Sequence, residues 1–225
     1  MVAWWTDRRA GDQRGVENGP LPPPLPRGTR LCHPRQVHGA AVIVVGAAAP
    51  PAAGAWGGTD DATPEADAVV GVGAGAALVM LTADCAPVAM GSPEGVHAAV
   101  HVGWRGLVAG VVEAAVGVMR SLGASSVVAG VGATIHPCCY AFSLDHLDEV
   151  VAVAGPAARG RTAGGAPALD LPGALRGRLA AADAALVWED DRCTGCGGPF
   201  FSHRVRGDDA RQALFVWRGV GAARA

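Results

Sequence analysis

Short apolar runs separated by glycine and turn residues fill the middle of the chain and predict β-strands. The clearest runs cover residues 66–70, 76–81, 86–90, 96–102 and 127–131, and two weaker runs near the end cover residues 186–188 and 214–217. Between two of them stands Ser92-Pro93-Glu94-Gly95, which is strong turn chemistry. We therefore expect residues 86–90 and 96–102 to pair as an antiparallel hairpin.

Apolar residues at helical spacing mark three further segments. Residues 107–122 form the clearest predicted helix, because its apolar side chains share one face: Leu107, Val111, Ala114, Val118 and Leu122. Residues 145–153 and 169–182 predict two more helices, whereas residues 154–168, rich in Gly, Ala and Arg, predict a mobile segment. Strands interleaved with helices, without the regular alternation of a doubly wound sheet, indicate an α+β fold.

Length and composition fit one globular domain. The 225 residues can bury one core, and prolines gathered between residues 18 and 28 predict an extended arm. We therefore predict an arm at 1–30 and a single domain at 31–225. No apolar run is long and uninterrupted enough to span a membrane, and residues 1–14 lack the apolar segment of a secretory signal. These features predict a cytoplasmic protein with no membrane partner, and they leave monomer and homodimer open.

The charge pattern argues against nucleic-acid binding. The net charge is −2, and all 18 basic residues are arginines that are scattered rather than gathered in one stripe. We therefore expect no nucleic-acid partner. Because lysine is absent, the sequence also excludes chemistry that needs a lysine Schiff base.

Cys85 and His101 flank the predicted hairpin, and each lies eight positions from Pro93. If the strands pair around that turn, the two side chains become cross-strand neighbours with Cβ atoms about 5 Å apart. His38 offers a second imidazole, and one thiolate with two imidazoles is typical of a catalytic zinc site with an open fourth position. The same spacing fits a cysteine hydrolase, with Cys85 as nucleophile and His101 as general base. A buried cysteine is also an ordinary core residue.

The residues beside this pair suggest an anion site. Gly103-Trp104-Arg105-Gly106 leads into the predicted helix, so free backbone amides and the Arg105 guanidinium are expected beside the metal. The alternative is that Trp104 is a core residue and Arg105 forms a structural ion pair. Asp84, directly before Cys85, is a candidate general base or a group that orients a metal ligand, and its carboxylate can equally cap a turn.

The six cysteines of the chain are Cys32, Cys85, Cys138, Cys139, Cys193 and Cys196. In a reducing compartment such a set is more often catalytic or metal-binding than disulfide-forming. Cys193 and Cys196 form a C-x-x-C pair, but the sequence offers no second C-x-x-C pair for a zinc ribbon. Gly197-Gly198-Pro199 follows, so no helix can begin there to activate a thiol. We therefore predict a structural role for this pair.

Several short motifs occur here in the order seen in one bacterial family: QVHG, TADCAPV, HVGWRG, IHPCCY, CT and FFSHR. From about Leu31 to about Trp217 the chain resembles the YfiH-type, laccase-domain family, also named polyphenol oxidase and described as zinc-dependent purine nucleoside phosphorylases. It departs from the family pattern at His136, Ala141 and His203, where glycine, glutamate and tyrosine are usual.

The resemblance implies a layered α/β/β/α arrangement with mixed sheets, and makes residues 31–225 the catalytic domain. It implies a catalytic zinc on His38, Cys85 and His101. It also implies phosphorolysis of adenosine, inosine and methylthioadenosine, together with deamination of adenosine to inosine. The expected partners are therefore small molecules, purine nucleosides and phosphate.

Under that resemblance the catalytic candidates are Cys85, Asp84 and Arg105. The substrate-binding candidates are Arg105, Gly103 and Gly106. A copper-dependent polyphenol oxidase, with copper in place of zinc, is a further alternative. It is disfavoured because a multicopper centre needs several histidine clusters, and the seven histidines of this chain include no H-x-H pair.

Overall fold

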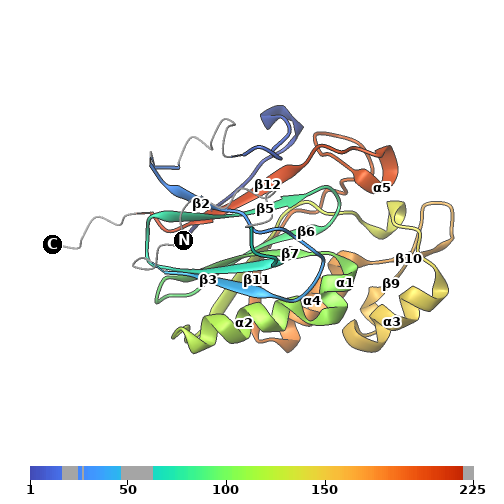
Figure 1. The fold of residues 1–225 in the computed structure, drawn as a ribbon. Helices are drawn as coiled ribbons and strands as arrows, with labels where there is room; N and C mark the ends of the chain where they lie inside the picture. Colours follow the sequence, from blue (N-terminus) through green and yellow to red (C-terminus); the bar gives the residue numbers. More distant parts are fainter. Residues whose placement is uncertain (17–24, 27, 47–62, 220–225) are drawn as a thin grey trace.

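The computed structural model describes residues 1–16, 25–26, 28–46 and 63–219. Two mixed β-sheets are stacked on each other, and most of the helices lie below the larger one (Figure 1). A separate two-stranded sheet lies near α3 at one end of the molecule. The predicted α+β class with mixed sheets is confirmed.

The larger sheet has six strands in the order β11-β8-β6-β7-β4-β3. They are β3 (Val42–Val45), β4 (Ala68–Val72), β6 (Ala86–Gly91), β7 (Val96–Val102), β8 (Val127–Val131) and β11 (Ala184–Glu189). β6 and β7 form the predicted antiparallel hairpin, and every residue of both strands is buried. They are buried on both faces because one face of the sheet meets the helices and the other meets the second sheet.

The smaller sheet has the order β1-β12-β5-β2. Its strands are β1 (Val2–Trp5), β2 (Arg30–Cys32), β5 (Ala76–Thr82) and β12 (Gln212–Trp217). The apolar pattern predicted neither β1 nor β2. β1 pairs with β12, so the predicted arm at 1–30 begins with a strand of this sheet. The proline-rich part of that arm lies largely outside the described residues, which omit 17–24 and 27.

Alternation along β5 and β12 separates two apolar cores. Leu78 and Met80 face the larger sheet, whereas Val79 and Phe215 face outward and pack with Val16. Removing such a side chain from water stabilises the fold by about 1.5–3 kcal/mol. Two short helical segments lie near the smaller sheet within the described residues. They are the 3-10 turn Arg8–Ala10 and α5 (His203–Arg206).

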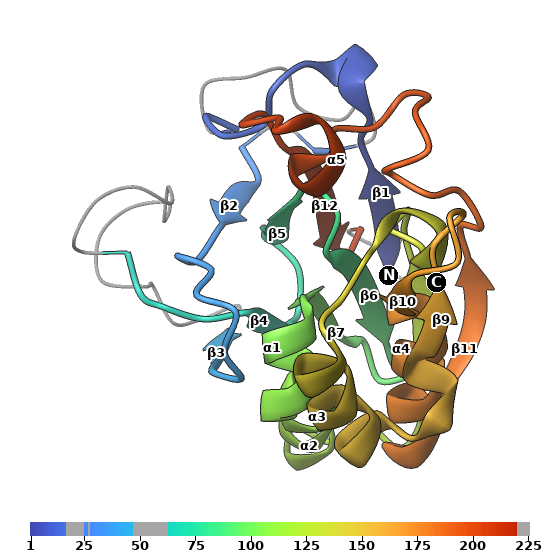
Figure 2. The ribbon, with the colours of Figure 1, turned by 90° about the vertical axis from the view of Figure 1, so that its right-hand side faces the viewer.

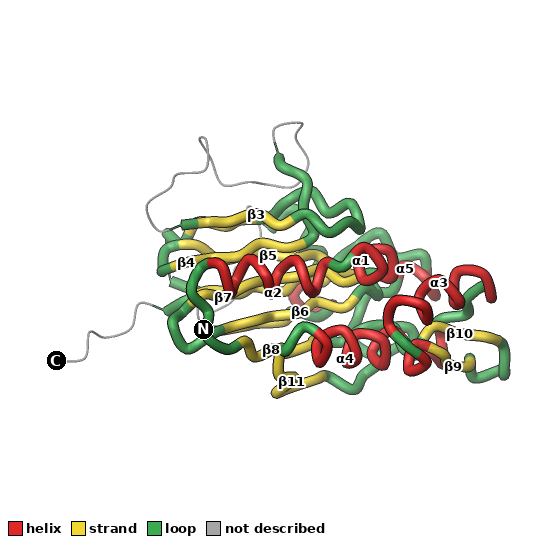
Figure 3. Tube along the Cα trace, turned by 90° about the horizontal axis from the view of Figure 1, so that it is seen from below, coloured by secondary structure: helices red, strands yellow, loops and turns green. Residues whose placement is uncertain are grey.

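Four helices pack together beneath the larger sheet: α1 (Trp104–Ala109), α2 (Val111–Ser121), α3 (Leu144–Ala154) and α4 (Leu171–Ala181). Seen from below, α1, α2 and α4 lie over its strands (Figure 3), and α3 lies beside α1 (Figure 2). α3 and α4 confirm the two shorter helices that the sequence predicted. No helix within the described ranges combines the length and hydropathy needed to cross a membrane.

The single helix predicted at 107–122 is wrong, because Gly110 divides it into α1 and α2. Gly110 has a φ of 86°, a left-handed conformation that suits glycine and ends α1. The break changes which face is buried. Met119 is fully buried, whereas Leu122, expected on the apolar face, is exposed.

The segment 154–168, which the sequence predicts to be mobile, contains regular structure. It contains the 3-10 turn Pro156–Ala158, the strand β9 (Arg159–Arg161) and the first residues of β10 (Pro167–Leu169). β9 and β10 pair around a turn closed by a hydrogen bond from the Thr162 amide to the Ala166 carbonyl at 2.9 Å. Neither strand has apolar alternation, so the sequence carried no signal for them.

Candidate metal centre and adjoining cavity

The β6–β7 hairpin brings Cys85 and His101 to the same end of the larger sheet. Pro87 pairs with His101, so Cys85 is two positions away from direct pairing with His101. The predicted cross-strand pairing is therefore wrong, because the hairpin is centred on Glu94 rather than on Pro93. A shift of two residues leaves a side chain on the same face of a sheet, and for this reason the two groups still meet.

His38, Cys85 and His101 offer ligand atoms that lie within 4.8 Å of one another. Cys85 Sγ is 3.9 Å from His38 Nε2, and the two imidazole rings lie edge to face with centroids 4.9 Å apart. His38 is exposed, Cys85 is partly buried and His101 is buried. The structure thus brings together all three predicted ligands, in a cluster that is open on one side.

Asp67, which was not predicted from the sequence, connects two of these groups. Its Oδ1 accepts a hydrogen bond from His101 Nδ1 at 2.7 Å, which leaves Nε2 of that ring free to bind a ligand. The fully buried carboxylate also accepts the backbone N–H groups of Val37, His38 and Gly39, at 3.2, 3.0 and 2.7 Å. These bonds hold His38 at a left-handed φ of 59°. The available signal was an aspartate directly before an apolar strand, since a carboxylate is buried only when it is paired.

The electrostatics of the centre favour an ionised thiol. Burial raises the pKa of Cys85, but His101 and His38 outweigh it and lower that pKa from 9.0 to about 6. Burial lowers the pKa of His101, whereas Cys85 and Asp67 raise it to about 9. At neutral pH the metal-free centre is therefore a thiolate beside an imidazolium. The thiolate is the form of cysteine that binds metals and attacks electrophiles.

Asp84 lies beside Cys85 in the loop between β5 and β6, with a φ of 101°. Its Oδ1 accepts the Thr194 hydroxyl at 2.6 Å, and its Oδ2 accepts the Arg204 backbone N–H at 2.7 Å. Its carbonyl accepts the Thr134 hydroxyl at 2.6 Å. Asp84 thus connects the Cys85 loop to later segments of the chain, and both of its carboxylate oxygens already accept hydrogen bonds.

A cavity of about 550 Å³ opens beside the three candidate ligands. Arg105 lines the cavity, and its guanidinium lies 4.5 Å from the centre of the Trp104 ring. Among the described residues, no carboxylate lies within ion-pair distance of Arg105. Arg204 stacks in the same way on Tyr140, at 4.9 Å. Burial raises the pKa of Tyr140 to about 12, so its phenol stays protonated. Arg105 was predicted from the sequence, whereas Tyr140 and Arg204 were not.

Gly103 and Gly106 are not among the described residues that line this cavity. A Cβ on Gly103 would lie 2.9 Å from His38 Cδ2 and 3.0 Å from Cys85 Sγ. A Cβ on Gly106 would lie 3.1 Å from the carbonyl oxygen of Gly39. Both glycines therefore let α1 approach the ligand loops closely.

The C-x-x-C pair of Cys193 and Cys196 also lies outside the cavity lining. No helix begins directly after Cys196, since the next helix, α5, starts at His203. A second pair of cysteines does lie beside it, the adjacent Cys138 and Cys139, although their spacing is not C-x-x-C.

Comparisons with known proteins give consistent matches. A family model described as multi-copper polyphenol oxidoreductase laccase matches residues 25–219. The chain is 40% identical over 191 residues to a purine nucleoside phosphorylase of Streptomyces coelicolor, covering 84% of this chain and 75% of that protein. It is 32% identical over 168 residues to the purine nucleoside phosphorylase YlmD of Geobacillus stearothermophilus, covering 70% and 61% of the two chains. The crystal structure of YlmD from that organism matches with a TM-score of 0.71 at 31% identity, over 84% of this chain and 74% of the other.

Proposed function

The chain belongs to the family described as multi-copper polyphenol oxidoreductase laccase, and we propose that it is a zinc-dependent purine nucleoside phosphorylase that also deaminates adenosine. The names of its relatives support the phosphorylase activity. The observation that carries the proposal is the cluster of His38, Cys85 and His101 beside a cavity in which Arg105 and Arg204 have no carboxylate partner among the described residues.

The donor set fits zinc. A thiolate and two imidazoles are zinc ligands, and the carboxylate–histidine contact of Asp67 with His101 is the usual support for a metal-binding imidazole. A bound zinc ion would supply Lewis-acid activation of the substrate. A multicopper oxidase needs further histidine clusters, and within the described residues the other candidate metal group consists of four cysteines.

The cavity has the size and chemistry for a nucleoside and an anion. Its volume of about 550 Å³ lies within the range of small-molecule sites. Of the other arginines that line it, Arg14 pairs with Asp12 at 2.7 Å and Arg35 pairs with Glu65 at 2.8 Å. The Arg211 side chain already donates to three backbone carbonyls, those of Asp208, Asp209 and Ala210. We therefore assign phosphate binding to Arg105. Arg204 is the second candidate, since its guanidinium stacks on an aromatic ring as that of Arg105 does.

In phosphorolysis, a phosphate oxygen forms a bond to the ribose C1′ as the bond from C1′ to the purine nitrogen breaks. The base leaves with the bonding electrons and takes up a proton, which gives free base and ribose 1-phosphate. Arg105 would orient the phosphate and offset its charge. Asp84 would act as a positioning residue that holds Cys85 and Arg204, because both of its oxygens are already occupied by hydrogen bonds. In deamination, water adds at C6 of adenosine and ammonia leaves.

The test combines metal analysis with product chromatography. Zinc-containing protein is incubated with adenosine, with and without phosphate. Adenine and ribose 1-phosphate that form only with phosphate support the proposal, and inosine supports the deaminase part. His101→Ala and Cys85→Ser should lose metal and both activities, whereas Cys32→Ala, a thiol between the two sheets, should retain them. Zinc-loaded protein that forms none of these products would contradict the proposal.

A second function is favoured by one specific observation. The arrangement resembles that of a cysteine hydrolase, in which Cys85 would be the nucleophile, His101 the general base and Asp67 the carboxylate that orients the base. Chelation distinguishes the two. A zinc enzyme loses activity when the metal is removed and regains it with zinc, whereas a cysteine hydrolase stays active without metal and is inactivated by alkylation of Cys85.

A further inference from the structure

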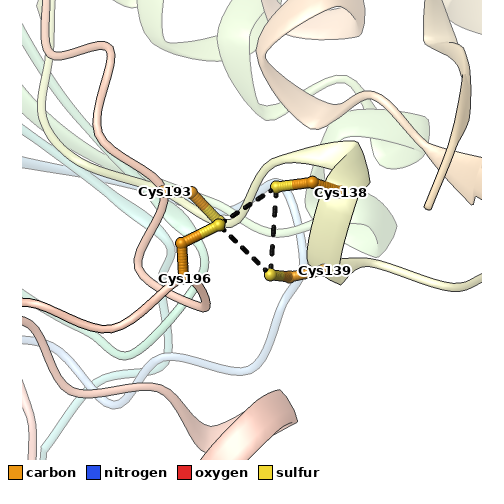
Figure 4. A group of neighbouring side chains, drawn as sticks. All are labelled: Cys138, Cys139, Cys193 and Cys196. Carbon is orange, nitrogen blue, oxygen red and sulfur yellow. Dashed lines mark hydrogen bonds between the residues drawn. The ribbon is translucent and has the colours of Figure 1, made fainter. Parts of the chain in front are cut away.

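Four thiols converge on one point outside the cavity, and we name them the four-cysteine cluster: Cys138, Cys139, Cys193 and Cys196. Their sulfur atoms all lie within 4.8 Å of one another (Figure 4). Cys196 Sγ is 3.3 Å from Cys138 Sγ and 3.5 Å from Cys139 Sγ, and the last two sulfurs are 3.8 Å apart. All four cysteines are free thiols.

Parallel strands explain why two distant pairs of cysteines meet. β8 and β11 pair in parallel, with one β-bulge between Leu186 and Trp188, so the chain leaves both strands at the same end of the sheet. An isolated parallel bridge between Thr134 and Cys193 continues this pairing, and the Thr194 amide bonds to the Thr134 carbonyl at 3.0 Å. The cluster is therefore built by the fold itself.

Two local features are those of a ligand site. The His136 backbone N–H donates to Cys193 Sγ at 3.3 Å, a hydrogen bond of the kind that stabilises a thiolate. Gly195 stands between the last two cysteines, where a Cβ would lie 2.6 Å from Cys139 Cβ and 3.0 Å from its sulfur. Any larger residue at that position would push the two pairs of cysteines apart.

The geometry points to a metal ion. In a tetrahedral zinc site with Zn–S bonds of about 2.3 Å, neighbouring sulfurs lie about 3.8 Å apart. The three sulfur–sulfur distances above run from 3.3 to 3.8 Å, at or somewhat below that value. Four thiolates are a soft donor set that selects zinc over hard cations such as magnesium, and they leave no position open for a substrate. We propose that a second zinc ion with a structural role is held by Cys138, Cys139, Cys193 and Cys196.

This second zinc would stabilise a wall of the cavity. Thr194, between the two later cysteines, donates to Asp84 Oδ1, and the Arg206 side chain donates to the Thr194 carbonyl at 3.0 Å. Asp84 in turn adjoins Cys85. An ion that ties this loop to Cys138 and Cys139 would hold Asp84 in place without contacting the substrate.

The metal stoichiometry of the full chain tests the inference. We expect about two zinc ions per chain in the wild type, about one in Cys196→Ser and about one in His101→Ala, because each variant empties one four-coordinate site. Cys32→Ala is the matched control and should keep both. If the wild type binds one zinc that only His101→Ala removes, the inference is wrong and the proposed function stands. If only Cys196→Ser removes it, the inference holds and the proposed catalytic metal is wrong.

A measurement on the wild type alone covers the case in which Cys196→Ser fails to fold. The zinc-loaded chain is alkylated before and after treatment with a chelator, and each cysteine is followed by peptide mass spectrometry. Although Cys196 is exposed, we expect it to react slowly until the chelator is added, together with its three partners. Rapid alkylation before chelation, or alkylation that requires a reductant because the thiols are disulfide-bonded, would overturn the inference.

Discussion

Replacing Asp67 by asparagine should weaken metal binding at the His38, Cys85 and His101 centre while leaving the ligands themselves intact. Oδ1 accepts hydrogen bonds from His101 and His38, and Oδ2 accepts them from Val37 and Gly39. Asparagine keeps one oxygen and replaces the other by an amino group. In either orientation, that amino group faces two N–H donors, so two of the four hydrogen bonds are lost.

The magnitude follows from these bonds. A hydrogen bond to a charged group contributes about 1.5–3 kcal/mol, so losing two costs about 3–6 kcal/mol. Loss of a group that orients a metal ligand typically lowers metal affinity about 10- to 100-fold, which is about 1.4–2.8 kcal/mol. We expect that fall in zinc affinity for Asp67→Asn. The remaining loss should appear in the free energy of unfolding of the metal-free protein.

Zinc affinity is measured by competition with a chromogenic chelator, and the free energy of unfolding by urea titration of the chelated protein. Asp148→Asn is the matched control, since Asp148 is exposed and bonds Arg159 on the surface. It should change neither quantity appreciably. If Asp67→Asn binds zinc as tightly as the wild type and unfolds at the same urea concentration, Asp67 does not support the metal centre.

Three further predictions concern the same region. Gly103→Ala should lower zinc affinity about tenfold, because its Cβ would crowd His38 and Cys85, whereas Gly117→Ala, with open space around it, should not; equal affinities measured by chelator competition would contradict this. Arg105→Ala should raise the KM for phosphate about tenfold at unchanged zinc content, because an anion contact is lost; an unchanged KM with a lower Tm would make Arg105 purely structural. In the metal-free protein the alkylation rate of Cys85 should rise with pH through about 6, because its thiolate forms above that pKa; a midpoint near 9.0 would show that the two imidazoles do not lower it.

Local signals predicted most strands and two helices, because a turn motif, an apolar period and a glycine each act within a few residues. The Ser92–Gly95 turn fixed the hairpin, although its centre at Glu94 could not be read from the proline position. The break at Gly110 was missed, because an isolated glycine within an apolar period is compatible with a continuous helix.

The candidate site divides in the same way. His38, Cys85 and His101 stood in recognisable motifs, and the fold brings them together. Asp67 could not be assigned, because its role depends on bonds to two separate parts of the chain. The four-cysteine cluster depends on the parallel pairing of β8 and β11, and no spacing within the sequence reports which distant strands become neighbours.

The position of β1 at the edge of the smaller sheet bears on how the protein can be produced. β1 covers one side of β12, a strand whose six residues are all buried. Trp5 also anchors β1 to the larger sheet, through its ring contact with Trp188 and its indole N–H bond to the Pro87 carbonyl at 3.4 Å. A version that starts after Trp5 would keep every residue of the metal centre but expose an apolar strand edge, which invites pairing between molecules. Such a truncated protein would self-associate and become insoluble, although its metal centre would be intact.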